Sequence, residues 1–419
     1  MNVNVLLLAA GMLALTATAE AAITAADFGA KGDGSADDSA AIQKALNAAA
    51  ERRGGRVDLG AGRFRLDKPI EIPEGVTLAG VWEAPHHAQL TNGTVLEVYA
   101  GKGDESAPPL ITLNPSSAVK GLTFFYPEQR VPETVAYPFT IKGRGMHCSV
   151  VDCTFVNPYK AMDFGSEWNE LHYVRNCFGC PLKVGVFVDQ CSDIGRIENV
   201  HFNPHYWMRA ETEGMPTWET LREYLFRNLV AFDFARTDWE YVHNTFVFGA
   251  SIGYRFRTDR SGSVNGNFLG IGADWCDTAV LVEQCQMPGL LITNGEFVGG
   301  QGAHTFLRVA ATNTGVVQFS NCSFWGPCPT IAVIEGTGTI SFSQCNFLNH
   351  GQPEDTWTID ARGGDLIVQA CRFGSGRPDI RLGEDVASAV IMGNRFAGEK
   401  RIENHSKGDV QEGMNVSAR

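Results

Sequence analysis

The sequence predicts an all-β fold, a right-handed single-stranded parallel β-helix, which is a solenoid with an N-terminal capping helix and an arm inserted in mid-chain. The first observation is a short motif ending in Phe that returns at intervals of 22 to 29 residues, which suits one coil of such a solenoid. The second is the composition, because 46 Gly residues and only 19% charged residues favour short strands joined by tight turns. The third is that 44% of the 419 residues are hydrophobic, which is enough for a long core.

The repeated motif is an aliphatic residue, a gap, Asn or another small residue, and then Phe, as in Val151-Asp-Cys-Thr-Phe155. Its copies end at Phe155, Phe178, Phe202, Phe246, Phe268, Phe297, Phe324, Phe347, Phe373 and Phe396. Each coil of a solenoid buries its apolar face only against its neighbours. We therefore expect these Phe side chains to form an aromatic stack in the core.

Two other residue types recur within the motif. The Asn residues, expected to stack in one turn and to hydrogen-bond along the solenoid, are Asn176, Asn199, Asn244 and Asn321. The Cys residues that share one position are Cys153, Cys177, Cys322, Cys345 and Cys371. We interpret these five as buried thiols, although the odd total of 11 Cys leaves at least one free or paired between chains.

One interval between motifs, from Phe202 to Phe246, is too long for a single coil, and it contains the arm, residues 203–228. Within it, Pro216-Thr217 followed by residues 218–226 predicts a short helix with an N-cap. The arm is rich in aromatic residues, which are Tyr206, Trp207, Trp218, Tyr224 and Phe226. It could form one wall of a sugar site, with Trp207 and Trp218 as candidate sugar-stacking residues, or it could pack against the solenoid or another subunit.

Residues 1–21 resemble a signal peptide, because Val5 to Leu15 is apolar and Ala19-Glu20-Ala21 suits cleavage, although the first four residues carry no Lys or Arg. We therefore expect a secreted or periplasmic protein that does not enter a membrane after cleavage, since no later stretch could span a bilayer. The remaining chain divides into a cap with the first coils, residues 22–80, and the other coils, residues 81–419. The net charge of −13 argues against nucleic acid as a partner.

The N-terminal cap carries a recognisable pattern. It contains Asp27-Phe-Gly-Ala-Lys-Gly-Asp33-Gly34-Ser-Ala-Asp37-Asp38, then Gly54-Gly55-Arg-Val57, Gly60-Ala-Gly62-Arg-Phe64 and Gly75-Val-Thr-Leu-Ala-Gly80. This pattern resembles the N-terminal signature of the pectate lyase superfamily, which includes rhamnogalacturonases, polygalacturonase-related proteins, β-1,3-glucanases and phage tailspikes. The resemblance implies the fold, a polysaccharide or oligosaccharide substrate and compatibility with a homotrimer. The acidic residues of this segment are expected to be structural, with Asp38 as the N-cap of a helix whose apolar face closes the first coil.

The resemblance does not supply the reaction, because the Gly-His-Gly, Arg-Ile-Lys and Trp-x-Asp-His patterns of polygalacturonases and pectate lyases are missing. We therefore aligned the strand that follows each Phe, using apolar-x-apolar triplets such as Met162-Asp163-Phe164. Every second residue of a strand points outward. One outward column then holds Asp163, Phe187, Asp233, Arg255, Leu281 and Arg308. A second column, two residues later, holds Asp189, Arg257, Glu283, Glu335 and Asp360.

These columns suggest two chemistries on a uronic-acid-containing polysaccharide. In glycoside hydrolysis, Asp189 with Asp163 or Asp233 would form an acid and base pair at roughly 6.5–9.5 Å. The side chains expected to grip the substrate are Arg257, Arg308 and Glu283, joined by Trp239 and His243 from the adjoining face. In a lyase, Arg255 or a nearby Lys would abstract the proton next to the uronate carboxylate, and the aspartates would hold Ca²⁺.

We adopt glycoside hydrolysis as the leading hypothesis, with Arg255 as the fourth candidate catalytic residue. For this reaction we expect no cofactor and no metal site. A non-catalytic glycan-binding β-helix is a third alternative, because charges on an exposed solenoid face are often only solubilising. In that case Asp233 and Arg255 would form an ordinary cross-strand ion pair.

Overall fold

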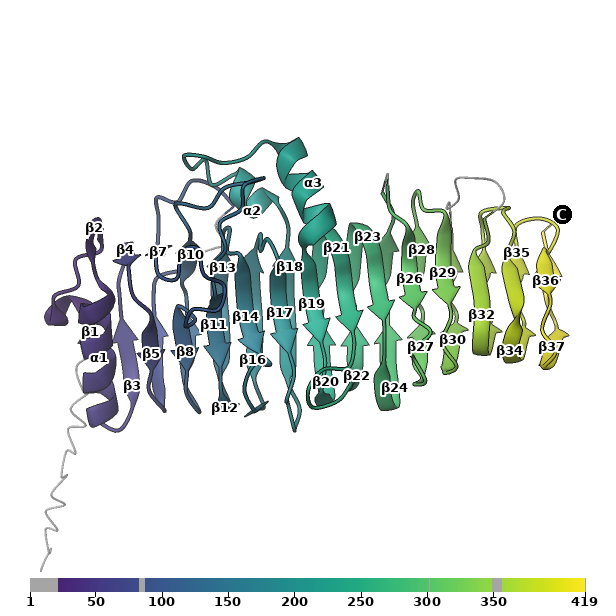
Figure 1. Cartoon of the computed structure of the whole chain (residues 1–419), viewed down its shortest axis with the longest axis horizontal. Helices are drawn as coiled ribbons and strands as arrows, with labels where there is room; N and C mark the ends of the chain where they lie inside the picture. The colour runs from purple at the N-terminus through teal and green to yellow at the C-terminus, as the bar shows by residue number, and fades with distance from the viewer. Residues whose placement is uncertain (1–21, 83–86, 301, 349–355, 419) are drawn as a thin grey trace, which may run out of the picture.

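The computed structural model describes residues 22–82, 87–300, 302–348 and 356–418. The predicted signal peptide, residues 1–21, lies outside them. The strands pair in parallel from one coil to the next and form three long faces around a continuous hydrophobic core (Figure 1). We call these faces sheet A, sheet B and sheet C, in the order in which the chain passes through them. The fold is therefore the predicted right-handed parallel β-helix.

Most strands lie entirely within one of these three sheets. Sheet A contains β5 (Ile70–Ile72), β8 (Ile111–Leu113), β11 (Phe139–Gly143), β14 (Lys160–Phe164), β17 (Val184–Val188), β19 (Val230–Phe234), β26 (Thr305–Val309), β29 (Thr330–Ile334) and β36 (Ile402–Asn404). Sheet B contains β1 (Ile23–Thr24), β3 (Gly55–Asp58), β6 (Val76–Ala79), β9 (Ala118–Lys120), β20 (Thr237–His243), β22 (Val264–Leu269), β24 (Cys285–Thr293), β27 (Val317–Ser320), β30 (Thr339–Ser343) and β37 (Asp409–Gly413). Sheet C contains β2 (Asp33–Asp37), β4 (Gly62–Leu66), β7 (Thr94–Val98), β10 (Thr123–Phe125), β25 (Glu296–Val298), β28 (Ser323–Trp325), β31 (Asn346–Phe347), β33 (Arg372–Phe373), β35 (Arg395–Phe396) and β38 (Val416–Ser417).

The longer strands bend from one sheet into the next. From sheet B into sheet C run β13 (Ser149–Phe155), β16 (Tyr173–Gly179) and β18 (Arg196–Phe202). From sheet C into sheet A run β21 (Phe246–Phe256) and β23 (Gly272–Val282), and from sheet A into sheet B run β32 (Ile359–Gln369) and β34 (Ile380–Met392). A separate short pair, β12 (Gly145–Met146) with β15 (Asn169–Glu170), lies between sheets A and B.

The N-terminal end is closed by α1 (Ser39–Glu51), which follows the short 3-10 helix η1 (Ala25–Phe28) (Figure 1). As expected, α1 buries Ile42, Ala45 and Leu46. The prediction that the Asp38 side chain caps this helix is wrong. Its carboxylate instead accepts hydrogen bonds from the backbone N–H groups of Lys31 and Gly32. The acidic side chain therefore fastens the preceding loop.

The turn between sheets B and C repeats a left-handed residue in coil after coil. Its φ is 57° at Asn176, 51° at Asn199, 52° at Asn244 and 54° at Asn321, a conformation that Asn tolerates better than most residues. Asn199 Nδ2 donates to Asn176 Oδ1 at 2.8 Å, and Asn321 Nδ2 donates to Asn294 Oδ1 at 2.7 Å. The shared turn position of the predicted Asn column is confirmed, whereas its hydrogen bonding is confirmed only in part, for Asn176 with Asn199.

The aromatic stack is confirmed only in part. Seven Phe residues of the motif point into the core of sheet C, and they are Phe155, Phe202, Phe297, Phe324, Phe347, Phe373 and Phe396. Phe178 and Phe246 pair with outward positions of neighbouring strands, and Phe268 lies in sheet B. An alternating strand reverses its faces when the chain shifts by one residue, so spacing alone could not separate the two faces. All 11 Cys are free and buried, as expected for the five that share a position.

The arm contains α2 (His205–Met208) and α3 (Trp218–Asn228) and lies over the middle coils, between β18 and β19 (Figure 1). The predicted helix cap is confirmed, because Thr217 Oγ1 accepts a hydrogen bond from the Thr220 backbone N–H. Helix α3 buries Leu221 and Leu225 and packs on β21. No helix within the described ranges is long and apolar enough to cross a bilayer.

Candidate functional site

The outer face of sheet A carries the column of side chains that the sequence predicted. Strand pairing places Asp163 beside Phe187, Phe187 beside Asp233, and Asp233 beside Arg255. The column continues through Leu281 to Arg308. One coil before Asp163, the same column holds Lys142.

The second column is correct up to Glu335, with one error at its end. Asp189, Arg257, Glu283 and Glu335 each follow the last residue of a sheet A strand, but Asp360 pairs with Val333 and therefore belongs to the first column. The sequence alignment used Trp357-Thr358-Ile359, whereas the strand begins at Ile359. Both frames alternate apolar and polar residues, so the pattern could not separate them.

The two aspartates nearest the N-terminus are buried and hydrogen-bonded to backbone. Asp163 is 2% exposed, and its Oδ1 accepts from the N–H groups of Gly165 and Ser166 at 2.8 Å each. Asp189 is fully buried, and its Oδ1 accepts from the Arg236 N–H at 3.0 Å, while its Oδ2 has no partner in the described structure. These bonds hold both carboxylates in fixed orientations at the corner between sheets A and B.

The remaining charges of the columns are paired with one another. Arg257 makes a bidentate contact with Asp233, with nitrogen–oxygen distances of 2.8 and 3.1 Å, and also binds Asp259. Burial raises the pKa of the Asp233 carboxyl, an effect that the Arg257 guanidinium partly offsets. Arg255 bonds Glu283 Oε1 through Nε and Nη2 at 2.9 and 2.7 Å instead of contacting Asp233.

Arg308 lies farther along the same column and is more open to solvent. It reaches Glu335 at 3.4 Å, and its side chain is 55% exposed. Its long distance and high exposure leave this guanidinium the most accessible of the three arginines in the two predicted columns.

A cleft of about 480 Å³ opens on sheet A beside Asp163. Its lining includes Lys142, Lys160, Glu105 and Ser166 together with the Pro-rich loop before β8. Lys160 Nζ lies 4.8 Å from the centre of the Phe139 ring and donates to the Glu105 carbonyl at 3.1 Å. Burial lowers the pKa of the Lys160 ammonium, and Glu105 opposes this only in part.

The two lysines of this cleft were missed by the sequence reasoning. The triplet alignment began at Met162, and one coil earlier the triplet Ile141-Lys142-Gly143 would have placed Lys142 beside Asp163. Lys160 gives no such signal, because it stands at the start of β14, before the alternation begins. Lys142 forms an ion pair with Glu167 at 2.5 Å.

The four predicted aromatic and imidazole contacts lie away from this cleft. Trp207 is 1% exposed within the arm, and Trp218 stacks on His205 with ring centroids 5.2 Å apart. Trp239 is 51% exposed on β20, and His243 lines a separate cleft with Asn176 and other residues of the turn between sheets B and C. The structure therefore does not gather them around Asp233.

Among the described residues, the three ligating side chains close enough to hold a metal are His172, Cys191 and Glu240. All three are fully buried in the core. The imidazole of His172 bonds Glu240 Oε1 through Nε2 and Asn169 Oδ1 through Nδ1, each at 3.0 Å. Both ring nitrogens already have partners, so this group is an internal ion pair.

Comparison with known proteins agrees with this architecture. Residues 22–113 match a family described as rhamnogalacturonase A/epimerase, pectate lyase-like. A search of curated protein sequences finds no significant match. Among solved structures, the catalytic unit of an α-1,3-glucanase from Streptomyces thermodiastaticus is 13% identical over 94% of this chain and 69% of that chain, with a TM-score of 0.57.

Two further structures extend the comparison. The N-terminal fragment of gene product 12 of bacteriophage Phi29 is 11% identical, over 94% of this chain and 70% of that chain, with a TM-score of 0.57. A mannuronan C-5 epimerase module from Azotobacter vinelandii is 14% identical, over 95% and 99%, with a TM-score of 0.46. The strand pairing shows a right-handed parallel β-helix, and its N-terminal part, residues 22–113, is similar to the pectate lyase-like family.

Proposed function

We propose that this protein is an exported carbohydrate-active enzyme that cleaves glycosidic bonds of a uronic-acid-containing polysaccharide bound along sheet A. Support for a carbohydrate substrate comes from the family that residues 22–113 match, and from a similar fold that is named as an α-1,3-glucanase. The volume of the cleft beside Asp163, about 480 Å³, falls within the range of about 300 to 1,000 Å³ that is usual for ligand clefts.

The observation that favours a particular reaction is the pair of lysines in this cleft. Burial lowers the pKa of Lys160, and a lower pKa favours the neutral amine that a general base requires. We propose that the neutral Lys160 amine takes the proton on C5 of a uronate while the Lys142 ammonium faces its carboxylate. The electrons of the C–H bond form a C4–C5 double bond, the C4–O4 bond breaks, and the leaving oxygen takes a proton from water.

This proposal replaces the aspartate pair as the favoured machinery, for a structural reason. Asp163 and Asp189 each accept hydrogen bonds from backbone N–H groups, and Asp233 is held by Arg257. An inverting hydrolase needs one carboxyl that holds a proton and a second that faces water. All three residues are largely buried, at 2%, 0% and 7% exposed, and of the three only Asp163 lines the cleft.

Hydrolysis is the second candidate, because the Asp163 carboxylate lines the same cleft as Lys142 and Lys160. In that reaction Asp163 would protonate the leaving oxygen, and a second carboxylate such as Glu105 would activate water. The elimination with Lys160 as base requires no cofactor. A Ca²⁺-dependent elimination would instead need oxygen ligands for the ion, and the substrate would supply part of this set.

The proposal is tested by incubating the mature protein, from Ala22, with uronic-acid and neutral polysaccharides, with and without a chelator. Reducing ends and absorbance near 235 nm are followed together, since only elimination creates the absorbing double bond. We expect the absorbance to rise equally with and without the chelator. Absorbance that the chelator abolishes would support the Ca²⁺-dependent reaction. Reducing ends without absorbance would support the hydrolase, and no product from any uronic-acid substrate would contradict the proposed function.

A further inference from the structure

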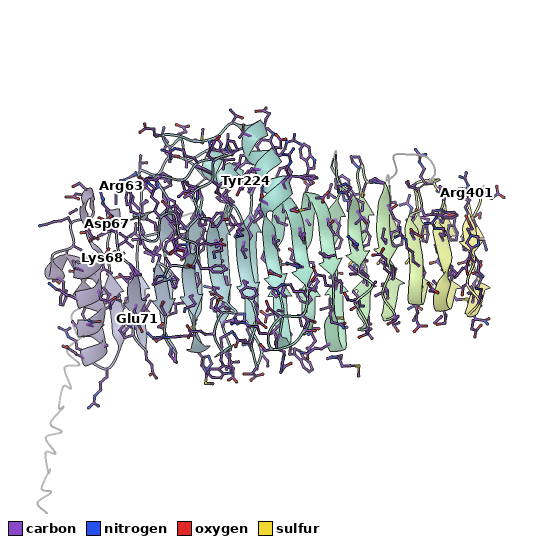
Figure 2. All side chains as sticks on the ribbon, in the orientation of Figure 1. Arg63, Asp67, Lys68, Glu71, Tyr224 and Arg401 are labelled. Atoms are coloured by element: carbon purple, nitrogen blue, oxygen red, sulfur yellow. The ribbon has the colours of Figure 1, made fainter. Side chains whose placement is uncertain are left out.

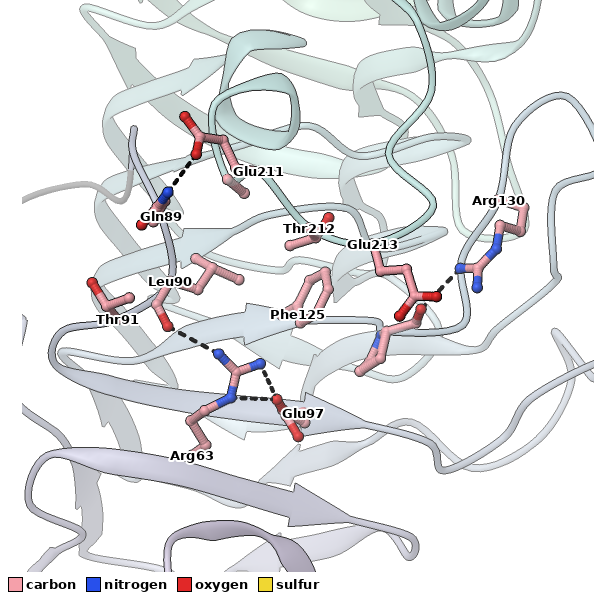
Figure 3. Close-up of a pocket in the computed structure, with 12 residues that line it drawn as sticks. Arg63, Gln89, Leu90, Thr91, Glu97, Phe125, Arg130, Glu211, Thr212 and Glu213 are labelled. Carbon is pink, nitrogen blue, oxygen red and sulfur yellow. Dashed lines mark hydrogen bonds and ion pairs between the residues drawn. The ribbon is translucent and has the colours of Figure 1, made fainter.

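A second cleft, of about 410 Å³, lies on the outer surface of sheet C, where the arm folds over the N-terminal coils (Figure 3). Its residues come from β4, β7, the end of β10, the segment 89–91, the loop residues Pro127 and Arg130, and residues 210–213 of the arm. It shares no lining residue with the cleft on sheet A. The arm therefore roofs a cavity of its own.

Phe125 and Leu90 form the apolar part of the cleft lining and are largely buried. Phe125 and Leu90 are 5% and 4% exposed, and Figure 3 shows the Phe125 ring between the arm and the strand that carries Glu97. Arg63 Nε donates to Glu97 Oε1 at 2.6 Å, and its Nη1 donates to the Leu90 carbonyl at 3.0 Å. The cleft thus joins an apolar ring to a fixed rim of charged hydrogen-bonding groups.

The charge of the cleft disfavours an anionic ligand. Both guanidinium groups already have partners, because Arg63 binds Glu97 and Arg130 Nη1 donates to the carbonyls of Pro127 and Gln129 at 2.9 and 2.7 Å. Three carboxylates line the cleft, and they belong to Glu97, Glu211 and Glu213. The cleft therefore offers hydrogen-bond acceptors and a net negative charge, and a uronate would be repelled.

One polar atom in the cleft has no partner. Thr212 Oγ1 is buried and makes no hydrogen bond within the described residues. A buried hydroxyl without a partner is costly, so its presence in the lining of a cavity points to a ligand that completes it. The hydroxyl can both donate and accept, as the hydroxyls of a sugar can.

We infer that this cleft is a second saccharide-binding site, which takes a neutral, hydroxyl-rich sugar unit. The ring of the sugar stacks on Phe125, its hydroxyls donate to the carboxylates of Glu211 and Glu213, and Thr212 Oγ1 completes the contact. The inference depends on the proposed function only for the expectation that the ligand is a saccharide. It assigns the arm the role of holding a neutral part of the polymer away from the reacting uronate.

The experiment measures binding of neutral tetrasaccharides (fragments of β-1,4-galactan, β-1,3-glucan and β-1,4-xylan) by calorimetry and by saturation-transfer NMR, with tetragalacturonate as the anionic comparison. Thr212→Val is expected to lower the affinity for the bound neutral saccharide about three- to ten-fold, the loss of one hydrogen bond. Its melting temperature is expected to stay equal or rise, since the hydroxyl has no partner in the free protein.

The matched control is Thr220→Val, which removes a hydroxyl of the same arm that bonds Thr217 and does not line the cleft. It should leave the affinity for the neutral saccharide unchanged. Lys160→Met should also leave that affinity unchanged while it lowers turnover strongly, so a failure of the proposed reaction is told apart from a failure of this inference. Binding that is equal in Thr212→Val and the native protein, or no binding by any neutral saccharide, would overturn the inference.

Discussion

Replacing His172 by Leu should destabilise this protein by about 3–5 kcal/mol, because it leaves a buried charge on Glu240 without its cation. Both side chains are fully buried, and Glu240 Oε2 would keep only the Thr237 hydroxyl, at 2.8 Å. The Asn169 side-chain amide donates to the Phe164 and Asp189 carbonyls, so its oxygen is the acceptor for His172. Both imidazole nitrogens therefore face acceptors, which suits the protonated ring.

The pKa of His172 is consistent with this ion pair. Burial alone would lower the pKa, but the Glu240 carboxylate, together with Cys191, outweighs it and raises the pKa from 6.5 to about 10. This difference corresponds to about 5 kcal/mol, of the same order as the expected cost of the substitution. Because the folded-state pKa is the higher one, this contribution is complete below about pH 6.5 and is lost as the pH rises through about 10.

The assay is a double-mutant cycle measured by urea denaturation at pH 7. His172→Leu and Glu240→Leu should each cost several kcal/mol, whereas the double variant should cost less than their sum, because no unpaired charge remains. Costs that simply add, or a His172→Leu variant that loses less than about 1 kcal/mol, would refute the ion pair.

Three further predictions concern the two columns, the cleft and the turn. Arg257→Met should lower the free energy of unfolding by several kcal/mol, because it leaves the Asp233 carboxylate buried without its cation. Arg255→Met leaves a partly exposed Glu283 without its cation and should cost less than about 1 kcal/mol. Equal losses of the two variants in denaturation would contradict this prediction. Turnover should rise with pH and level off below pH 10.5, because only the deprotonated Lys160 amine accepts a proton and burial lowers its pKa. A pH–rate profile in which turnover falls as the pH rises toward 10.5 would count against Lys160 as the base. Asn199→Ala should lower the free energy of unfolding by about 1–3 kcal/mol, because the hydrogen bond to Asn176 is lost and Ala is strained at a φ of 51°. Asn199→Gly should cost less, since Gly adopts this φ without strain. Thermal melts that rank the two variants in the opposite order would argue against the Asn column.

The sequence was sufficient for the fold and for the register of sheet A, because apolar-x-apolar triplets alternate with a period of two and each coil repeats the last. It failed at Asp360, where a shift of two residues preserves that alternation. It also failed to assign the Phe residues to faces, since the motif spans the bend between sheets B and C.

The site itself was harder to predict than the fold. Lys160 stands where a loop enters the strand, so no periodic pattern marks it, and its environment comes from Glu105 and Phe139, which are distant in sequence. Trp207 was expected to face a sugar, but the arm lacks the periodicity that would reveal which of its side chains are buried. Tertiary contacts decide both cases. Figure 2 shows side chains over the whole length of the solenoid, including Tyr224 on the arm.

The most direct test of the central claim compares Lys160→Met with Lys183→Met on a uronic-acid polysaccharide, following absorbance near 235 nm. Lys183 is the matched control, because it also binds Glu105, at 2.6 Å, and stands over an aromatic ring, yet it does not line the cleft. If Lys160 is the base, its substitution should lower turnover about 10²- to 10⁴-fold, and Lys183→Met should retain most of the activity. Equal activity in the two variants, or full activity in Lys160→Met, would contradict the account.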